Sequence, residues 1–234
     1  MAGFAWQNSR KGIVSMENIR KQLTRYGKQV LEKGLAAGPG GNISAREGEY
    51  VYLSPSGFAL DEILPEQWVR VNLKTGRVDG NIRPTCEISM HLGCYLKRPE
   101  IRAVIHTHPP VTLGMISAGI GLKPFYPDFV AILGAEIPMV DYVIPAGEEI
   151  RKAVVDKIAR CNVVLLKNHG AVCVGETIKE AFIRAWMTEE SAKMQCVGMM
   201  LGKITYFTRK QIRDIENLEA EDYRKMLLKK TGKK

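Results

Sequence analysis

The segment Ile105-His106-Thr107-His108-Pro109-Pro110 is the centre around which the rest of this chain is organised. It continues the apolar run that starts at Ala103 and holds two of the four histidines in 234 residues. A short apolar run predicts a buried strand, and the two prolines predict that the strand ends there and a helix begins. Residues two apart on a strand point to the same face. The segment therefore predicts a strand that presents the imidazoles of His106 and His108 side by side at its end.

Two further residues complete a candidate metal site. His169 follows another apolar run, residues 162–166, and Glu87 lies upstream of the histidine pair. Three imidazoles and a carboxylate are the donors of catalytic zinc sites, which keep a position open for substrate. The same donors accept Mn²⁺, Co²⁺ or Fe²⁺. The alternative is a set of core histidines with satisfied hydrogen bonds, but the spacing of the pair favours metal binding. His91, four residues after Glu87 on one predicted helix, is expected to be structural.

Net charge and cysteine content help to exclude some classes of function and location. The formal net charge is +9, but six basic residues crowd the last eleven positions, which is typical of a solvated tail: Arg224, Lys225, Lys229, Lys230, Lys233 and Lys234. We therefore expect no nucleic-acid partner and infer that the positive field helps to attract an anionic substrate. The five cysteines are widely spaced and include no CxxC pair, which predicts free thiols and a cytoplasmic location. No signal peptide or membrane span is expected.

The order of predicted elements indicates an α/β protein. Residues 1–15 are expected to form an N-terminal extension and residues 16–234 a single domain. Hairpins followed by alternating strands and helices predict three α/β/α layers around a central mixed, largely antiparallel sheet. Ser15, Thr85 and Thr177 are candidate helix caps. The predicted helices are 16–35, 87–96, 110–118, 147–159, 177–201 and 208–230, and the predicted strands are 42–46, 50–53, 68–73, 77–78, 103–107, 139–143, 162–166 and 171–174.

Three clusters of small residues are candidate anion sites. They are Gly41-Asn42, Ser56-Gly57 and Thr85-Cys86. Backbone N–H groups in such turns, with amide or hydroxyl donors nearby, hold phosphates or carboxylates, and Thr85 also stands at a predicted helix N-terminus. Each cluster alone is as consistent with an ordinary turn. We expect the three to meet beside the histidines at one end of the sheet.

Taken together, these segments resemble the class II aldolase/adducin family. The resemblance runs from about residue 16 to residue 201. Five short motifs carry it, in the order and at the intervals of the family: Gly41-Asn42-Ile43-Ser44, Ser54-Pro55-Ser56-Gly57, Pro84-Thr85-Cys86-Glu87, His106-Thr107-His108 and Asn168-His169-Gly170.

The resemblance implies a function and a role for each motif. It implies zinc-dependent cleavage of a ketose 1-phosphate, fuculose-phosphate-like, to dihydroxyacetone phosphate and an aldehyde through a metal-stabilised enediolate. His106, His108 and His169 match the zinc ligands, and Glu87 matches the catalytic acid/base, which also ligates zinc in the resting enzyme. A homotetramer with sites at subunit boundaries is implied. The phosphate-binding positions are matched by Gly41, Asn42, Ser56, Gly57, Thr85 and Cys86.

Two departures keep alternatives open. Cys86 stands where the family has a second phosphate-binding serine, and a thiol is a poor donor. The family also places tyrosines near the substrate; Tyr126 or Asp128 could serve in the loop at residues 123–129, and Tyr223 is the candidate catalytic residue from the C-terminal helix.

Those departures leave a metal-dependent decarboxylase of a sugar acid or β-keto acid as the main rival, because both reactions share an enolate. A sugar-phosphate 4-epimerase is disfavoured by Glu87, since such epimerases tend to have Asp there. An adducin-like binding module would be expected to lack the metal ligands.

Overall fold

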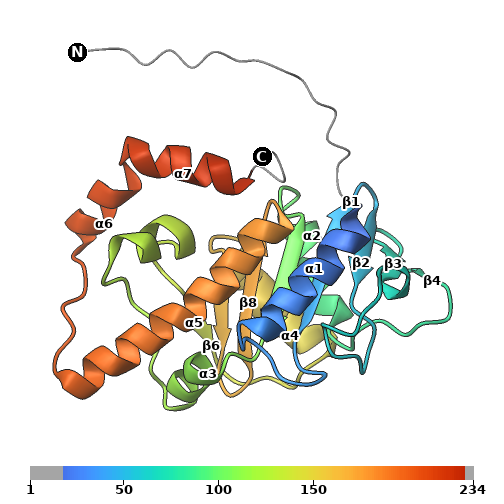
Figure 1. Ribbon diagram of the computed structural model, residues 1–234, viewed down its shortest axis with the longest axis horizontal. Helices are drawn as coiled ribbons and strands as arrows, with labels where there is room; N and C mark the ends of the chain where they lie inside the picture. Colours follow the sequence, from blue (N-terminus) through green and yellow to red (C-terminus); the bar gives the residue numbers. More distant parts are fainter. Residues whose placement is uncertain (1–17, 230–234) are drawn as a thin grey trace, which may run out of the picture.

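A computed structural model describes residues 18–229 and shows helices on both faces of an eight-stranded sheet (Figure 1). The strand order is β4-β3-β2-β1-β5-β8-β7-β6. Every neighbouring pair is antiparallel except β6 and β7. This confirms the predicted mixed, largely antiparallel sheet. The strands are β1 (Asn42–Glu47), β2 (Tyr50–Leu53), β3 (Val69–Asn72), β4 (Val78–Asp79), β5 (Ala103–Thr107), β6 (Met139–Val140), β7 (Val163–Leu166) and β8 (Gly170–Gly175).

The helices form the two outer layers. In Figure 1, α1 and α5 cross the front of the sheet, while α2 and α4 lie behind it. A 3₁₀ turn, η1 (Pro65–Gln67), and a π-helical segment, η2 (Phe129–Leu133), complete the described elements. None of the described helices is both long and apolar enough to cross a membrane. The helices are α1 (Ile19–Glu32), α2 (Ile88–Lys97), α3 (Pro110–Ser117), α4 (Gly147–Ile158), α5 (Ile178–Leu201), α6 (Arg209–Glu216) and α7 (Glu219–Lys229).

Strand alternation divides the core into two apolar clusters. Ile105 belongs to the cluster with residues of α1 and α5, and Val104 to the cluster with residues of α2 and α4. Side chains two apart on a strand share a face, so His106 lies on the same side of the sheet as Val104. Its imidazole therefore faces the layer that contains α2, and Glu87 is the N-cap residue of that helix.

The central strand β5 ends where the flanking strands begin. Asn42 of β1 lies opposite His106 on one side, and Val172 of β8 lies opposite it on the other. Pro109 is the N-cap residue of α3 and Pro110 its first residue, as predicted. This register brings the turns before β1 and β8 to the end of the sheet that holds the histidines.

Three local predictions concern helix ends. Thr177 caps α5 by accepting a hydrogen bond from the Glu180 N–H, as expected. Thr85 is not the N-cap residue of α2, although its hydroxyl accepts a 3.3 Å hydrogen bond from the Glu87 N–H. The predicted extension 1–15, with Ser15, lies outside the described residues, and α1 is capped by Asn18.

The prediction of one C-terminal helix over 208–230 is wrong. The chain forms α6 and α7 instead: the Leu218 N–H donates to the carbonyl of Ile215, three residues back, and the helical pattern is interrupted after Glu216. Ile215 is buried, α6 packs on η2, and α7 contacts both η2 and α5 (Figure 1). The interruption accompanies these tertiary contacts, which the local helical pattern does not reveal.

Candidate metal and substrate site

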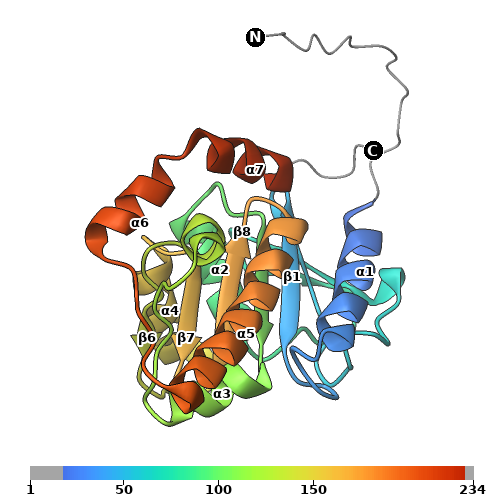
Figure 2. The ribbon, with the colours of Figure 1, turned by 60° about the vertical axis from the view of Figure 1, so that its left-hand side comes forward.

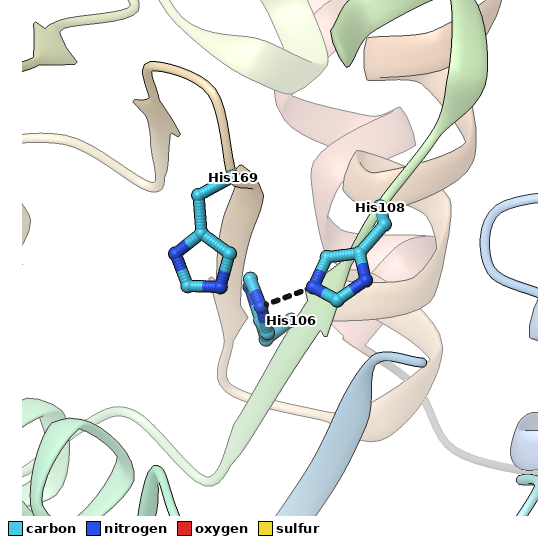
Figure 3. A group of neighbouring side chains, drawn as sticks. All are labelled: His106, His108 and His169. Atoms are coloured by element: carbon cyan, nitrogen blue, oxygen red, sulfur yellow. Dashed lines mark hydrogen bonds between the residues drawn. The ribbon is translucent and has the colours of Figure 1, made fainter. Parts of the chain in front are cut away.

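Three histidines converge from two neighbouring strands (Figure 3). His106 lies on β5, His108 directly follows β5, and His169 lies in the turn between β7 and β8. One nitrogen from each ring lies within 4.8 Å of the others, and the Nε2 atoms of His106 and His108 are 2.9 Å apart. The structure therefore brings together the predicted imidazole ligands.

The turn that carries His169 depends on an unusual backbone conformation. Asn168 has a φ of 56°, in the left-handed region that asparagine tolerates better than most residues. The following Gly170 lies so close to β5 that a Cβ there would overlap the carbonyl oxygen of Thr107. The absence of a side chain at Gly170 thus allows β8 to approach β5 and bring His169 to the pair.

Hydrogen bonding fixes the tautomer of His106, and burial keeps all three imidazoles neutral. Nδ1 of His106 lies 3.0 Å from the carbonyl oxygen of Ala171, which can only accept, so Nδ1 carries the proton and Nε2 keeps its lone pair. Burial holds the pKa of His106 well below its ordinary value, helped by His108 and His169. Burial is also the main cause that lowers the pKa of His108 and of His169. All three are therefore neutral at pH 7, as metal ligation requires.

Glu87 completes the cluster. Its Oε2 lies 3.3 Å from Nε2 of His106, and its Oε1 lies 3.4 Å from Nε2 of His169. The residue is only 4% exposed. Oε2 accepts a 2.7 Å hydrogen bond from Nδ2 of Asn42, but Oε1 is buried and has no hydrogen-bond partner among residues 18–229.

This donor set fits a divalent cation. A buried carboxylate oxygen without a donor costs free energy, and so does a neutral imidazole lone pair that faces it. A cation between the Glu87 oxygen and the imidazole nitrogens would remove both costs. Nitrogen and carboxylate oxygen donors suit Zn²⁺ and related transition metals.

The small-residue turns assemble beside these groups. Ser54-Pro55 bridges to Pro84-Thr85 through an isolated β-bridge, in which the Thr85 N–H donates to the Ser54 carbonyl at 3.0 Å. The Ser54 hydroxyl in turn accepts from the N–H of Ile43 at 3.1 Å. Gly41 has a φ of 71°, and a Cβ there would lie 2.9 Å from the His106 carbonyl oxygen. The three predicted turns therefore lie around Glu87 and the end of β5.

The predicted anion-binding residues in these turns differ in their exposure to solvent. Thr85 is buried, whereas Ser56, Gly57 and Cys86 are exposed and accessible to a ligand. Asn42 is 7% exposed, and both ends of its amide contact protein, Glu87 through Nδ2 and His91 through Oδ1.

The remaining candidates for substrate contact are Tyr126, Asp128 and Tyr223. The hydroxyl of Tyr126 bonds to that of Ser191 on α5 at 2.8 Å, which ties the loop to the helix. Asp128 is the N-cap residue of η2. Tyr223 is 62% exposed on α7. Figures 1 and 2 show α7 at the opposite end of the sheet from α3, which begins two residues after His108, so this chain's own α7 does not reach its histidines.

Two features were missed by sequence reasoning. Glu189 is fully buried on α5 and accepts hydrogen bonds from the N–H groups of Val111 and Thr112, at 3.0 and 2.9 Å, and from the Thr112 hydroxyl at 2.8 Å. It thereby holds the start of α3 directly after the histidine pair. No local pattern marks a glutamate of a long helix as buried. The second feature is a buried polar row behind Glu87 that includes His91, for which the i+4 spacing from Glu87 was the available signal.

The chain is similar in sequence to a known protein family over most of its length. Residues 21–196 match the model of the class II aldolase and adducin N-terminal domain. The chain is 33% identical over 190 residues to 5-deoxy-D-ribulose 1-phosphate aldolase of Bacillus thuringiensis serovar kurstaki, covering 80% of this chain and 89% of that protein. It is 30% identical over 191 residues to L-fuculose phosphate aldolase of Methanocaldococcus jannaschii, covering 79% and 99%.

Two further proteins extend the comparison: one relative is named for a different activity, and the other has a solved structure. The chain is 28% identical over 211 residues to 3-oxo-tetronate 4-phosphate decarboxylase of Pectobacterium atrosepticum, covering 87% of this chain and 94% of that protein. A solved L-fuculose 1-phosphate aldolase superposes with a TM-score of 0.81 at 25% identity, covering 89% of this chain and 98% of that one.

Proposed function

Because the chain belongs to the class II aldolase and adducin family, we propose that it is a zinc-dependent aldolase. Its substrate would be a ketose 1-phosphate, which it would cleave to dihydroxyacetone phosphate and an aldehyde. One observation carries the proposal: one buried and two half-buried imidazoles, all neutral, face Oε1 of Glu87, which has no hydrogen-bond partner among residues 18–229. His106, His108, His169 and Glu87 would hold the metal, and Mn²⁺, Co²⁺ or Fe²⁺ are alternatives to Zn²⁺.

The chemistry of an aldol cleavage matches the groups present. Breaking the carbon–carbon bond leaves negative charge on the carbon next to the ketone and the adjacent oxygens, and a bound divalent ion supplies Lewis acidity that stabilises such charge. The carbon must then receive a proton. Glu87 is the carboxyl group beside the imidazoles, and its Oε1 makes no hydrogen bond that would hold it away from substrate. We assign it the role of general acid/base.

Phosphate binding is assigned to the turns around the metal site. Gly41, Ser56, Gly57, Thr85 and Cys86 lie on segments that the structure joins next to Glu87. Backbone N–H groups in such turns attract anions, and the net charge of +9 favours the approach of a phosphate ester. We place Asn42 in this group by its backbone only, because its side-chain amide contacts Glu87 and His91.

A decarboxylase is the second candidate. It is supported by the decarboxylase relative and by Cys86, which stands where the aldolase pattern has a hydroxyl. Loss of CO₂ from a β-keto acid also leaves a carbanion beside a carbonyl, so the same metal and acid could act on it. We rank the aldolase first because five relatives at 30% identity or more are all named as aldolases.

One experiment separates the two candidates. The purified protein, stripped with a chelator and reloaded with Zn²⁺, is assayed against a panel of ketose 1-phosphates and a panel of β-keto sugar acids and their phosphates. Release of dihydroxyacetone phosphate supports the aldolase, and release of CO₂ supports the decarboxylase. Glu87→Gln protein from the same preparation controls for contaminating activity. Failure of the wild type to bind any divalent metal, together with no turnover on either panel, would rule out both enzymes and favour a binding module.

A further inference from the structure

A row of buried polar side chains runs away from the metal site behind Glu87. Nδ2 of Asn42 donates to Oε2 of Glu87 at 2.7 Å, and Oδ1 of Asn42 lies 2.5 Å from Nε2 of His91. Nδ1 of His91 lies 2.7 Å from the Ser44 hydroxyl, which lies 2.7 Å from the hydroxyl of Tyr95. His91 and Ser44 are fully buried, and Tyr95 is 1% exposed. The row therefore connects the carboxylate of Glu87 to the protein interior through direct hydrogen bonds between buried side chains.

The direction of every hydrogen bond in this row follows from the carboxylate of Glu87 at one end. The Glu87 carboxylate can only accept, so the NH₂ group of Asn42 must face it and the amide oxygen must face His91. Nε2 of His91 must then carry the proton. A neutral imidazole has a lone pair on its other nitrogen, so Nδ1 accepts from the hydroxyl of Ser44, which in turn accepts from the hydroxyl of Tyr95.

The protonation states of His91 and Tyr95 agree with these hydrogen-bond directions. Burial lowers the pKa of His91 to about 3, which keeps the ring neutral at pH 7. Burial also raises the pKa of Tyr95, which keeps its hydroxyl protonated and able to donate. The row is thus a chain of donors that all point toward Glu87.

From this chain we propose that His91 is a positioning residue for Glu87 and acts through Asn42. An asparagine amide can turn over and exchange its oxygen with its nitrogen. Turned over, Asn42 would place its oxygen against the carboxylate of Glu87 and repel it. The N–H of His91 stabilises the observed orientation, because in that orientation it donates to the Asn42 oxygen. With Oε2 held in this way, Oε1 points at His169.

This inference rests on the proposed metal site but not on which reaction it catalyses. It also assigns Asn42 a role other than phosphate binding through its side chain. Partners behind metal ligands typically contribute ten- to hundredfold to metal affinity. Zinc affinity of the metal-free protein, measured by competition with a chromophoric chelator, is therefore the direct readout.

Two matched variants separate positioning from packing. His91→Gln places its amide NH₂ near the position of Nε2, so it keeps the donor to Asn42 and loses the bond to Ser44. His91→Asn is one carbon shorter, so it keeps the side near Ser44 and loses the donor to Asn42. We expect His91→Asn to lower zinc affinity about tenfold or more and His91→Gln to match the wild type. Equal losses of affinity in the two variants would mean that His91 only fills space, and would overturn the proposal.

A double-mutant cycle tests the route through Asn42. Asn42→Ala removes the bond to Glu87 and is expected to weaken zinc binding about tenfold or more. If His91 acts through Asn42, His91→Asn has no further effect on zinc affinity in the Asn42→Ala background. Additive losses would overturn the proposed route. Tyr95→Phe, at the far end of the row, controls for stability and should keep zinc affinity.

These outcomes are distinguishable from failure of the proposed function. A wild-type protein that binds no zinc refutes the metal site and this inference together. A wild-type protein that binds zinc but cleaves no ketose 1-phosphate refutes the aldolase assignment alone, because the comparison of the variants still decides the role of His91.

Discussion

Oε1 of Glu87 lies 3.4 Å from Nε2 of His169, and no hydrogen bond of the described chain reaches that oxygen. The two residues come from different elements: Glu87 is the N-cap residue of α2, and His169 lies in the turn before β8. The opposite oxygen of the same carboxylate is held by Asn42. One carboxylate therefore has a fixed oxygen and an unpaired oxygen, and the unpaired one faces the imidazoles.

Removal of a central imidazole should abolish metal binding. His106→Ala deletes the fully buried ring whose Nε2 lies next to both His108 and Glu87. We expect loss of stoichiometric zinc, measured by elemental analysis of dialysed protein, and loss of turnover. His91→Gln serves as the control histidine substitution and should retain zinc. Full zinc content with normal turnover in His106→Ala would refute the site.

Glu87→Gln should separate catalysis from folding. The amide has the same size, and its oxygen can still accept from Nδ2 of Asn42. It cannot move a proton, so we expect kcat to fall by about 10²–10⁴-fold. Circular dichroism and a melting curve should show a folded protein. A near-normal rate would remove the acid/base role of Glu87.

Stability should depend on pH through His91. Burial lowers its pKa to about 3, whereas in the unfolded chain it takes up a proton below about pH 6.5. The unfolded state thus binds more protons between these values. Above about pH 6.5 His91 has no effect on the pH dependence; below it, the free energy of unfolding should fall toward pH 3 by up to ~1.4 kcal/mol per pH unit.

Urea unfolding in the presence of a chelator measures this pH dependence. His91→Gln cannot take up that proton, so its stability should fall less steeply with decreasing pH than that of the wild type. The other histidines contribute equally to both proteins. Parallel curves for the two proteins between pH 4 and 6.5 would contradict the buried neutral state of His91.

Glu189 should be a strong contributor to stability. Glu189→Ala removes three hydrogen bonds to a buried carboxylate at the start of α3, which should cost about 3 kcal/mol in free energy of unfolding. The neighbouring Glu190 makes a partly exposed ion pair with Lys193, so Glu190→Ala should cost less than about 1 kcal/mol. Denaturant unfolding of both variants tests this. Similar small losses would mean that the contacts of Glu189 are not important for stability.

Because this chain's own α7 does not reach its histidines, Tyr223 can act only in the site of a neighbouring copy. We expect Tyr223→Phe to lower kcat in the assembled protein, while Tyr142→Phe, another exposed tyrosine, leaves it unchanged. Mixed oligomers of Glu87→Gln and Tyr223→Phe subunits should then recover activity, since some sites combine an intact Glu87 with an intact Tyr223. Mixtures no more active than the separate variants would exclude a shared site.

Local patterns predicted much of the fold and the centre of the site. Alternation and apolar runs located the strands, and Pro109 and Pro110 marked the end of β5 and the start of α3. The HxH spacing placed His106 and His108 together because a strand has a period of two. Donor chemistry and position after an apolar run added His169, and an upstream carboxylate added Glu87; the structure brings both to the same place.

The donor set, and the strand and turns that carry it, could be predicted because they depend on residue type and short-range periodicity. Three features emerged only from the three-dimensional structure: the break between α6 and α7, the burial of Glu189, and the row from Tyr95 through His91 to Glu87. Each of these depends on contacts between residues far apart in the chain. A buried polar side chain has a defined role only once its partners are in place, because its hydrogen bonds, and not its own chemistry, determine which atom donates and where it points.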